Sequence, residues 1–99
     1  MMSWFAAIAL GAATTGGAHA SIMSGFGGDI PRYAIVPGFW TVWFGPPMPE
    51  ETQEIVYFGV NTAFWACAWR ACPSLARLAC MAIAADTAIG FGARFLPRK

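Results

Sequence analysis

The sequence has 99 residues, of which 58% are hydrophobic and only 11% are charged. Soluble domains are roughly 45–50% apolar and about 25% charged, so this chain has too few charges to cover a water-facing surface of its size. A formal net charge of +1 also excludes a nucleic-acid-binding protein, which neutralises phosphates with clustered Lys and Arg. We therefore expect residues 1–99 to form a single all-α domain of an integral membrane protein.

The first segment, Met1 to Gly28, contains no charged residue. About 20 apolar residues suffice for a transmembrane helix, and the glycines after Ser24 favour a loop, so we predict a helix over about residues 3–24. A cleavable signal peptide is the alternative, because Ala18-His19-Ala20 has the small-x-small form of a cleavage site. The lack of Lys or Arg before the apolar stretch favours a retained helix.

Small residues recur at every fourth position of this segment, a spacing that lets helix backbones approach closely in lipid. They form two sets, Ala12, Gly16, Ala20, Ser24 and Gly28, and Ala13, Gly17, Ser21 and Gly25. We predict that these faces pack against a neighbouring helix.

The segment 33–46 is short, aromatic and bounded by prolines. Its prolines limit any helix to about eight residues, and Trp is enriched at membrane–water interfaces. We predict a short interfacial helix that does not cross the bilayer, and a full span is the alternative. The interfacial anchors on one face of this helix are Phe39, Trp40, Trp43 and Phe44.

A helical hairpin over about residues 52–72 and 75–95 follows, with its turn at Cys72-Pro73-Ser74. Together with the first helix it gives about three transmembrane helices. The second arm carries another set of small residues with four-residue spacing, and we predict that it is a packing face. Its members are Ala76, Cys80, Ala84, Ala88 and Gly92.

Basic residues predict the orientation in the membrane, because cytoplasmic loops are enriched in Lys and Arg. Three spans place Arg70 and Arg77 on one side, and on the other Arg32, Arg94, Arg98 and Lys99. This count places the C-terminus in the cytoplasm, whereas a fourth span over residues 33–46 would give three basic residues on each side and no orientation. With 19 alanines and five arginines to one lysine, the composition is typical of a GC-rich genome, as many bacteria have. We expect the membrane to be a bacterial inner or intracytoplasmic membrane.

Asp86 lies within an otherwise apolar helix, where an acid costs roughly 2.5–3.5 kcal/mol on insertion scales. Asp86 and Asn61 are at similar distances from Pro73, so we predict that they form an intramembrane hydrogen bond. A contact with another subunit and a proton-relay role are the alternatives. Small residues on the face of Asp86 would let a neighbour approach, namely Ala79, Ala82, Gly90 and Ala93.

His19 and the cysteines are the candidate metal ligands. Imidazole could bind a chlorophyll magnesium or a haem iron, whereas the simpler interpretation is a hydrogen-bonded histidine near the end of the first helix. Cys67, Cys72 and Cys80 match no metal-binding spacing, so we interpret them as small hydrophobic residues, with a Cys67–Cys72 or Cys72–Cys80 disulfide as the alternative. The sequence requires no cofactor, although a host complex could supply lipid or a chlorophyll- or carotenoid-type pigment.

No nucleotide-binding loop, metalloprotease motif or nucleophile elbow occurs, so we do not expect an enzyme. We expect a non-catalytic accessory subunit of a photosynthetic or respiratory membrane complex, whose partners are membrane lipids and other subunits. The alternatives are a holin-like pore-forming protein and a small proton-coupled transport component that uses Asp86.

Overall fold

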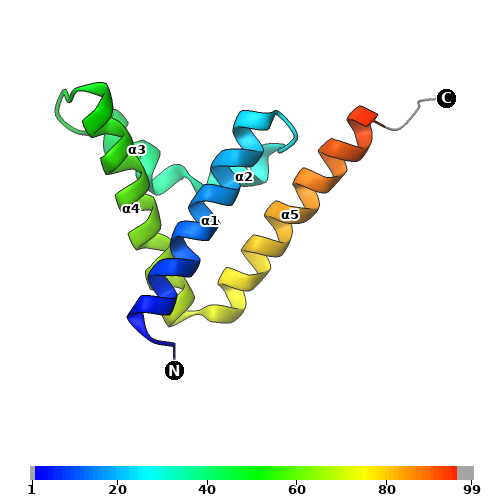
Figure 1. Ribbon diagram of the computed structural model, residues 1–99, viewed down its shortest axis with the longest axis horizontal. Coiled ribbons are helices and arrows are strands. Elements are labelled where there is room, and N and C mark those ends of the chain that lie inside the picture. The colour runs from blue at the N-terminus through cyan, green and yellow to red at the C-terminus, as the bar shows by residue number, and fades with distance from the viewer. Residues whose placement is uncertain (1, 96–99) are drawn as a thin grey trace.

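The computed structural model describes residues 2–95, and the part of the chain it describes contains helices and no strand. In chain order the helices are α1 (Trp4–Ser24), α2 (Asp29–Ala34), α3 (Val36–Phe44), α4 (Glu50–Ala71) and α5 (Pro73–Phe95). In Figure 1, α4 and α5 diverge from their shared turn, and α1 lies between them. The fold is therefore an open V of long helices, with the short helices α2 and α3 near its wide end.

Local hydrogen bonds at Ser3 and Gly25 define the two ends of helix α1. The Ser3 hydroxyl accepts a hydrogen bond from the Ala6 N–H at 3.1 Å and caps the first turn. At the other end Gly25 has a φ of 76°, and its N–H donates to the carbonyl of Ile22. Glycine adopts this left-handed conformation without steric cost, so the predicted end at Ser24 is confirmed.

Two helices, α1 and α5, are long and apolar enough to cross a membrane. Helix α4, which the sequence predicts to be the third, has 22 residues but does not meet this criterion. Its length is sufficient, but Glu50, Glu51 and Glu54 near its start and Arg70 near its end lower its apolar character. The expected number of transmembrane helices is thus supported for two of three.

The aromatic segment forms one short helix, α3, and a second short helix, α2, precedes it and overlaps only its start. Helix α2 was not predicted, whereas α3 matches the expected short aromatic helix and has nine residues. Pro37 lies in the first turn of α3, where its missing N–H costs no helical hydrogen bond. At about 1.5 Å per residue α3 is roughly 13 Å long, less than half of a ~30 Å hydrocarbon core. The prediction that this segment does not form one continuous spanning helix is confirmed.

The predicted hairpin is present, with Cys72 alone between α4 and α5. Its arms do not pack along their length, because α2 lies between them. The Trp65 indole N–H of α4 donates to the Ala34 carbonyl of α2 at 2.7 Å, and Ile83 of α5 forms a buried cluster with Ala18 and Ala34. The small core therefore lies where α1, α2 and α5 meet.

Helix α1 packs most closely against α4. A Cβ atom built on Gly11 would lie 2.5 Å from the Thr62 carbonyl oxygen and 2.7 Å from the Ala66 nitrogen, so only glycine fits at this crossing. The buried face of α1 consists of Ala7, Gly11, Thr14, Thr15, Ala18 and Ser21.

This face corrects the prediction from small-residue spacing, since it shares only Ser21 with the two predicted sets. Gly16 and Gly17 each belong to one predicted set, and a Cβ atom added at either would meet no atom within 4 Å. In a helix where most residues are small, a four-residue spacing occurs on several faces at once, and spacing alone does not select the one that packs.

Candidate functional site

Asn61 and Asp86 do not bond to each other, and this predicted pairing is wrong. Asn61 is fully buried, where its Oδ1 accepts from the Gly38 N–H at 3.3 Å and its Nδ2 donates to Thr15 Oγ1 at 2.9 Å. Asp86 is half-buried, and its Oδ2 accepts from the Gly28 N–H at 2.6 Å. Each polar side chain is satisfied within the protein by a different partner.

The segment that carries α2 and the start of α3 explains this difference. Gly28 is the N-cap residue of α2 and Gly38 lies in the first turn of α3, where backbone N–H groups have no partner within their helix. Asp86 and Asn61 supply those partners from α5 and α4. Asp86 thus has a hydrogen-bond partner within the protein, whereas its intramembrane position stays a prediction, and Gly90, on the same face, lies directly against the Phe26 carbonyl.

Thr14 joins three helices. Its Oγ1 accepts from the Trp69 indole N–H of α4 at 2.9 Å and donates to the Leu10 carbonyl at 2.7 Å. The sulfur of Cys80, on α5, lies 3.4 Å from the same oxygen. A second bridge between α1 and α5 links Ser21 and Thr87, whose hydroxyl oxygens are 2.7 Å apart.

These hydroxyl and indole groups were not singled out from the sequence. The available signal was the presence of Thr and Ser on apolar helices, since such groups need partners away from water. Within residues 2–95, no buried side-chain nitrogen or oxygen lacks a hydrogen-bond partner. The network therefore accounts for the polar side chains inside the helix bundle.

His19 packs against two aromatic residues of α4. Its Nδ1 lies 3.5 Å from the Tyr57 hydroxyl oxygen, and its ring contacts the Phe58 ring edge-on at a centroid distance of 5.1 Å. This is the hydrogen-bonded histidine of the simpler interpretation. Its role as a pigment ligand stays a prediction.

All three cysteines are free, so neither alternative disulfide is present. Cys67 and Cys72 are exposed, whereas Cys80 is half-buried against Thr14. In the described part of the chain, no three His, Cys, Asp or Glu side chains lie close enough to hold a metal ion.

The aromatic residues of α3 form a largely exposed cluster. Trp40 is 60% exposed and Phe44 is 77% exposed, and their rings contact each other at a centroid distance of 5.9 Å. Phe39 and Trp43 form a second edge-on pair at 4.9 Å. The face predicted from their spacing exists, and its position at a membrane boundary stays a prediction.

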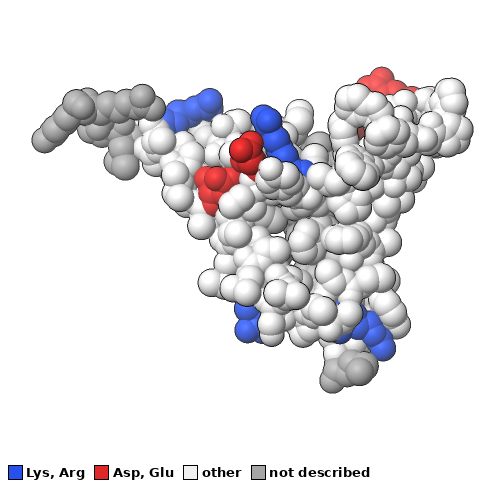
Figure 2. Space-filling model, turned by 180° about the vertical axis from the view of Figure 1, so that it is seen from behind, with Lys and Arg blue, Asp and Glu red and all other residues white. Residues whose placement is uncertain are grey.

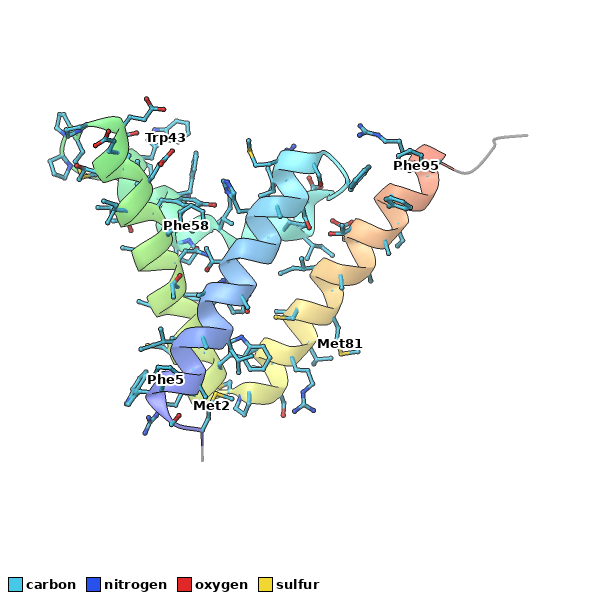
Figure 3. All side chains as sticks on the ribbon, viewed as in Figure 1. Met2, Phe5, Trp43, Phe58, Met81 and Phe95 are labelled. Atoms are coloured by element: carbon cyan, nitrogen blue, oxygen red, sulfur yellow. The ribbon has the colours of Figure 1, made fainter. Side chains whose placement is uncertain are left out.

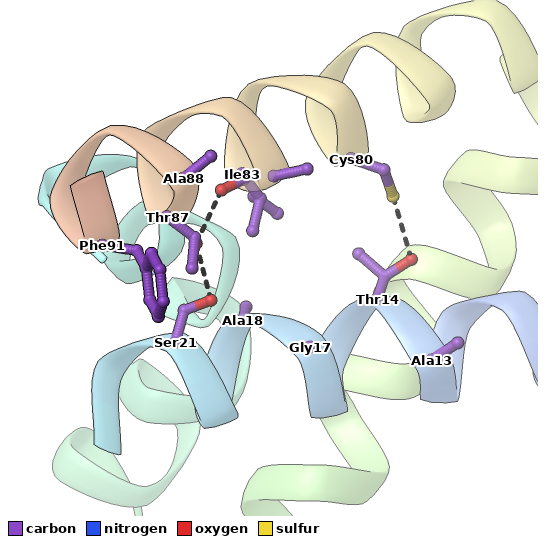
Figure 4. Close-up of a pocket in the computed structure, with 11 residues that line it drawn as sticks. Ala13, Thr14, Gly17, Ala18, Ser21, Cys80, Ile83, Thr87, Ala88 and Phe91 are labelled. Atoms are coloured by element: carbon purple, nitrogen blue, oxygen red, sulfur yellow. Dashed lines mark hydrogen bonds between the residues drawn. The ribbon is translucent and has the colours of Figure 1, made fainter. Parts of the chain in front are cut away.

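An apolar groove of about 600 Å³ separates α1 from α5, as Figure 4 shows. Small residues predicted to be packing faces line both walls, with Ala13 and Gly17 on α1 and Ala84 and Ala88 on α5. The hydrogen-bonded pairs Thr14–Cys80 and Ser21–Thr87 connect the walls. Other lining residues are Ala18, Ile83 and Phe91.

Apart from Asp86, which lies near the middle of α5, the charged residues of the long helices lie toward the helix ends. On the face drawn in Figure 2, blue and red atoms gather toward two opposite ends, with an uncharged surface between them. Arg70 lies in the last turn of α4, and Arg94 lies in the last turn of α5, at the opposite end of the hairpin. Arg98 and Lys99, which also entered the orientation count, lie outside the described residues.

Comparison of the chain with protein-family models, with curated proteins and with solved structures found no match.

Proposed function

We propose that this protein is an integral membrane protein that acts as a non-catalytic accessory subunit of a larger photosynthetic or respiratory complex. In this role it packs against neighbouring subunits, lipids or pigments. The uncovered apolar surface of α5 carries the proposal.

Along its 23 residues α5 buries only Ala76 and Ile83 within the described chain. Figure 3 shows Met81 pointing away from α1. A contiguous apolar surface of this kind requires lipid or a protein partner, because in water it would promote aggregation. The large apolar side chains exposed on α5 are Leu75, Leu78, Met81, Ile89, Phe91 and Phe95.

The polar network supports a packing role. Asn61, Asp86, Thr14 and Ser21 are all engaged in hydrogen bonds between elements of the chain. Such bonds hold helices together in lipid, where the hydrophobic effect between helices is absent. These groups therefore serve the architecture of the subunit.

The experiment is mild detergent solubilisation of host membranes, followed by capture of the tagged full chain and mass spectrometry of the captured proteins. We expect the chain to resist extraction by alkaline carbonate and to migrate with a large complex on a native gel. A chain that is stable and monodisperse alone, and absent from every large complex, would contradict the subunit role. An absorption spectrum of the captured sample tests for pigment.

We also propose a bacterial inner or intracytoplasmic membrane, with the C-terminus in the cytoplasm. Cys72 is exposed at the α4–α5 turn, next to Arg70, and offers a native reporter for this orientation. We expect a membrane-impermeant thiol reagent to label Cys72 from the outer side in cells with a permeabilised outer membrane. The variant Cys72→Ser should lose that labelling. Labelling only after inner-membrane lysis would reverse the orientation.

A further inference from the structure

The walls of the groove between α1 and α5 offer no free polar group to an occupant. The polar lining residues Thr14, Ser21, Cys80 and Thr87 bond across the groove in two pairs. Thr14 and Thr87 also donate to carbonyl oxygens within their own helices. A molecule that enters the groove therefore contacts only alkyl and aromatic groups. A hydrocarbon chain matches this lining, because it needs no hydrogen-bond partner.

The two cross-links limit the thickness of the occupant. They are seven residues apart on each helix, or about 10 Å along the axis, and each holds α1 and α5 within side-chain contact. A helix with its side chains is about 10–12 Å wide, so it covers the mouth of such a groove without entering. An extended acyl chain is thin enough to enter. Gly17, Ala84 and Ala88 keep the space open by lacking bulk.

A positive charge lies at one end of the groove. Phe91 lines this end and contacts the Phe26 ring at a centroid distance of 5.2 Å. The Arg94 guanidinium lies 5.3 Å from the centre of the same Phe26 ring. Among residues 2–95, Arg94 forms no ion pair with a carboxylate. An apolar groove that ends at an exposed arginine complements an amphiphile with an anionic head.

We propose that this groove binds one acyl chain of an anionic membrane phospholipid, whose phosphate group contacts Arg94. The site rests on the proposed function, because it requires that α1 and α5 lie in a bilayer. It gives the chain a specific lipid contact, distinct from the general apolar surface of α5.

Two adjacent glycines provide a matched test of the groove. A Cβ atom added at Gly16 or at Gly17 meets no atom within 4 Å beyond its own stretch of helix, so neither position is closed to a side chain at its first atom. Only Gly17 lines the groove. The full chain is purified in a non-ionic detergent, and native mass spectrometry measures retention of added phosphatidylglycerol. We expect Gly17→Leu to weaken retention by about ten-fold or more, because leucine occupies the space of several methylene groups, and Gly16→Leu to leave it unchanged.

Two arginines of α5 test the headgroup contact. Phosphatidylcholine with the same acyl chains serves as the zwitterionic comparison. We expect the wild-type chain to prefer phosphatidylglycerol and Arg94→Gln to reduce that preference by about five-fold. Arg77→Gln, near the opposite end of α5, should leave the preference intact. Circular dichroism of each variant checks that its helical content is retained.

Three results would overturn the lipid site. Equal losses of lipid with Gly16→Leu and Gly17→Leu would show a non-specific lipid shell, and equal effects of Arg94→Gln and Arg77→Gln would remove the headgroup contact. A lipid-free dimer that Gly17→Leu converts to monomer would show that a second copy covers the groove. These failures leave the proposed function standing, whereas a chain recovered in the soluble fraction would refute the proposed function itself.

Discussion

The two sides of α1 are built from similar small residues but pack in opposite ways. Toward α4, the backbones meet at Gly11, and a buried amide and an indole N–H bond to the adjacent threonines. Toward α5, only two side-chain pairs connect the helices, and a groove of about 600 Å³ separates the rest. Small residues are present on both sides, and the close approach occurs on the side where Asn61 and Trp69 of the partner helix bond to α1.

The side chains of the two partner helices, α4 and α5, account for this difference in packing. Helix α4 presents Asn61 and Trp69, whose side chains reach hydroxyl groups on α1. The polar groups on the facing surface of α5 are only the short ones of Cys80 and Thr87, and the rest of that surface is apolar. Apolar contact alone gives little preference for protein over lipid tails, so in a bilayer the α5 side can remain open.

The largest expected effect on stability comes from adding a methyl group where α1 crosses α4. Gly11→Ala places a Cβ against the Thr62 carbonyl and the Ala66 nitrogen, and we expect a loss of about 2–3 kcal/mol in the free energy of unfolding, because backbone atoms must move apart. Gly16→Ala is the matched control and should stabilise the helix by up to ~1 kcal/mol. Thermal unfolding in detergent micelles, followed by tryptophan fluorescence, measures both. Equal effects would show that α1 and α4 do not meet at Gly11.

An intermediate effect is expected at the buried amide. Asn61→Leu removes the partners of the Gly38 N–H and of the Thr15 hydroxyl, and we expect a destabilisation of about 1–2 kcal/mol. A double-mutant cycle with Thr15→Val isolates the bond between the two side chains. Thr15→Val should cost less in the Asn61→Leu background than in the wild-type chain. Strict additivity would contradict the bond.

The smallest effect is expected on the α5 side. Asp86→Leu removes the acceptor of the exposed Gly28 N–H, and we expect a loss of about 1 kcal/mol or less in the free energy of unfolding, since water can replace the lost partner. Asp86→Asn retains an acceptor oxygen and should be near neutral. The same unfolding measurement compares both variants with Asn61→Leu. If Asp86→Leu lowered the free energy of unfolding as much as Asn61→Leu does, the α4 and α5 sides of α1 would not differ in the way described.

Much of the fold follows from residues that act locally. Gly25 ends α1, Cys72-Pro73 forms the hairpin turn, and the prolines around 37 and 46 limit α3, so these boundaries were predictable. Helix α2 was missed because six residues are too few to show a clear periodicity. Two of the three predicted spanning helices, α1 and α5, are long and apolar enough to cross a membrane, and a spanning role for α4 stays a prediction.

The candidate site was harder to predict because its contacts are non-local. The equal-depth argument for Asn61 and Asp86 treated the hairpin in isolation, whereas the 28–38 segment lies between its arms and takes both bonds. The predicted faces of Ala13 and Gly17, and of Ala84 and Ala88, do lie opposite each other, but across a groove. Spacing identified these surfaces, and it carried no information on the gap between them.

The two bonds to the 28–38 segment have a consequence for biosynthesis. The chain emerges from the ribosome N-terminus first. Asn61 is therefore synthesised 23 residues after Gly38, and Asp86 is synthesised 58 residues after Gly28. Until α4 and then α5 have been synthesised, the N–H groups of Gly38 and Gly28 can hydrogen-bond only to water or lipid headgroups. A nascent chain released after Ala71 would retain the first attachment and lack the second, so the angle of the V is set only when translation passes α5.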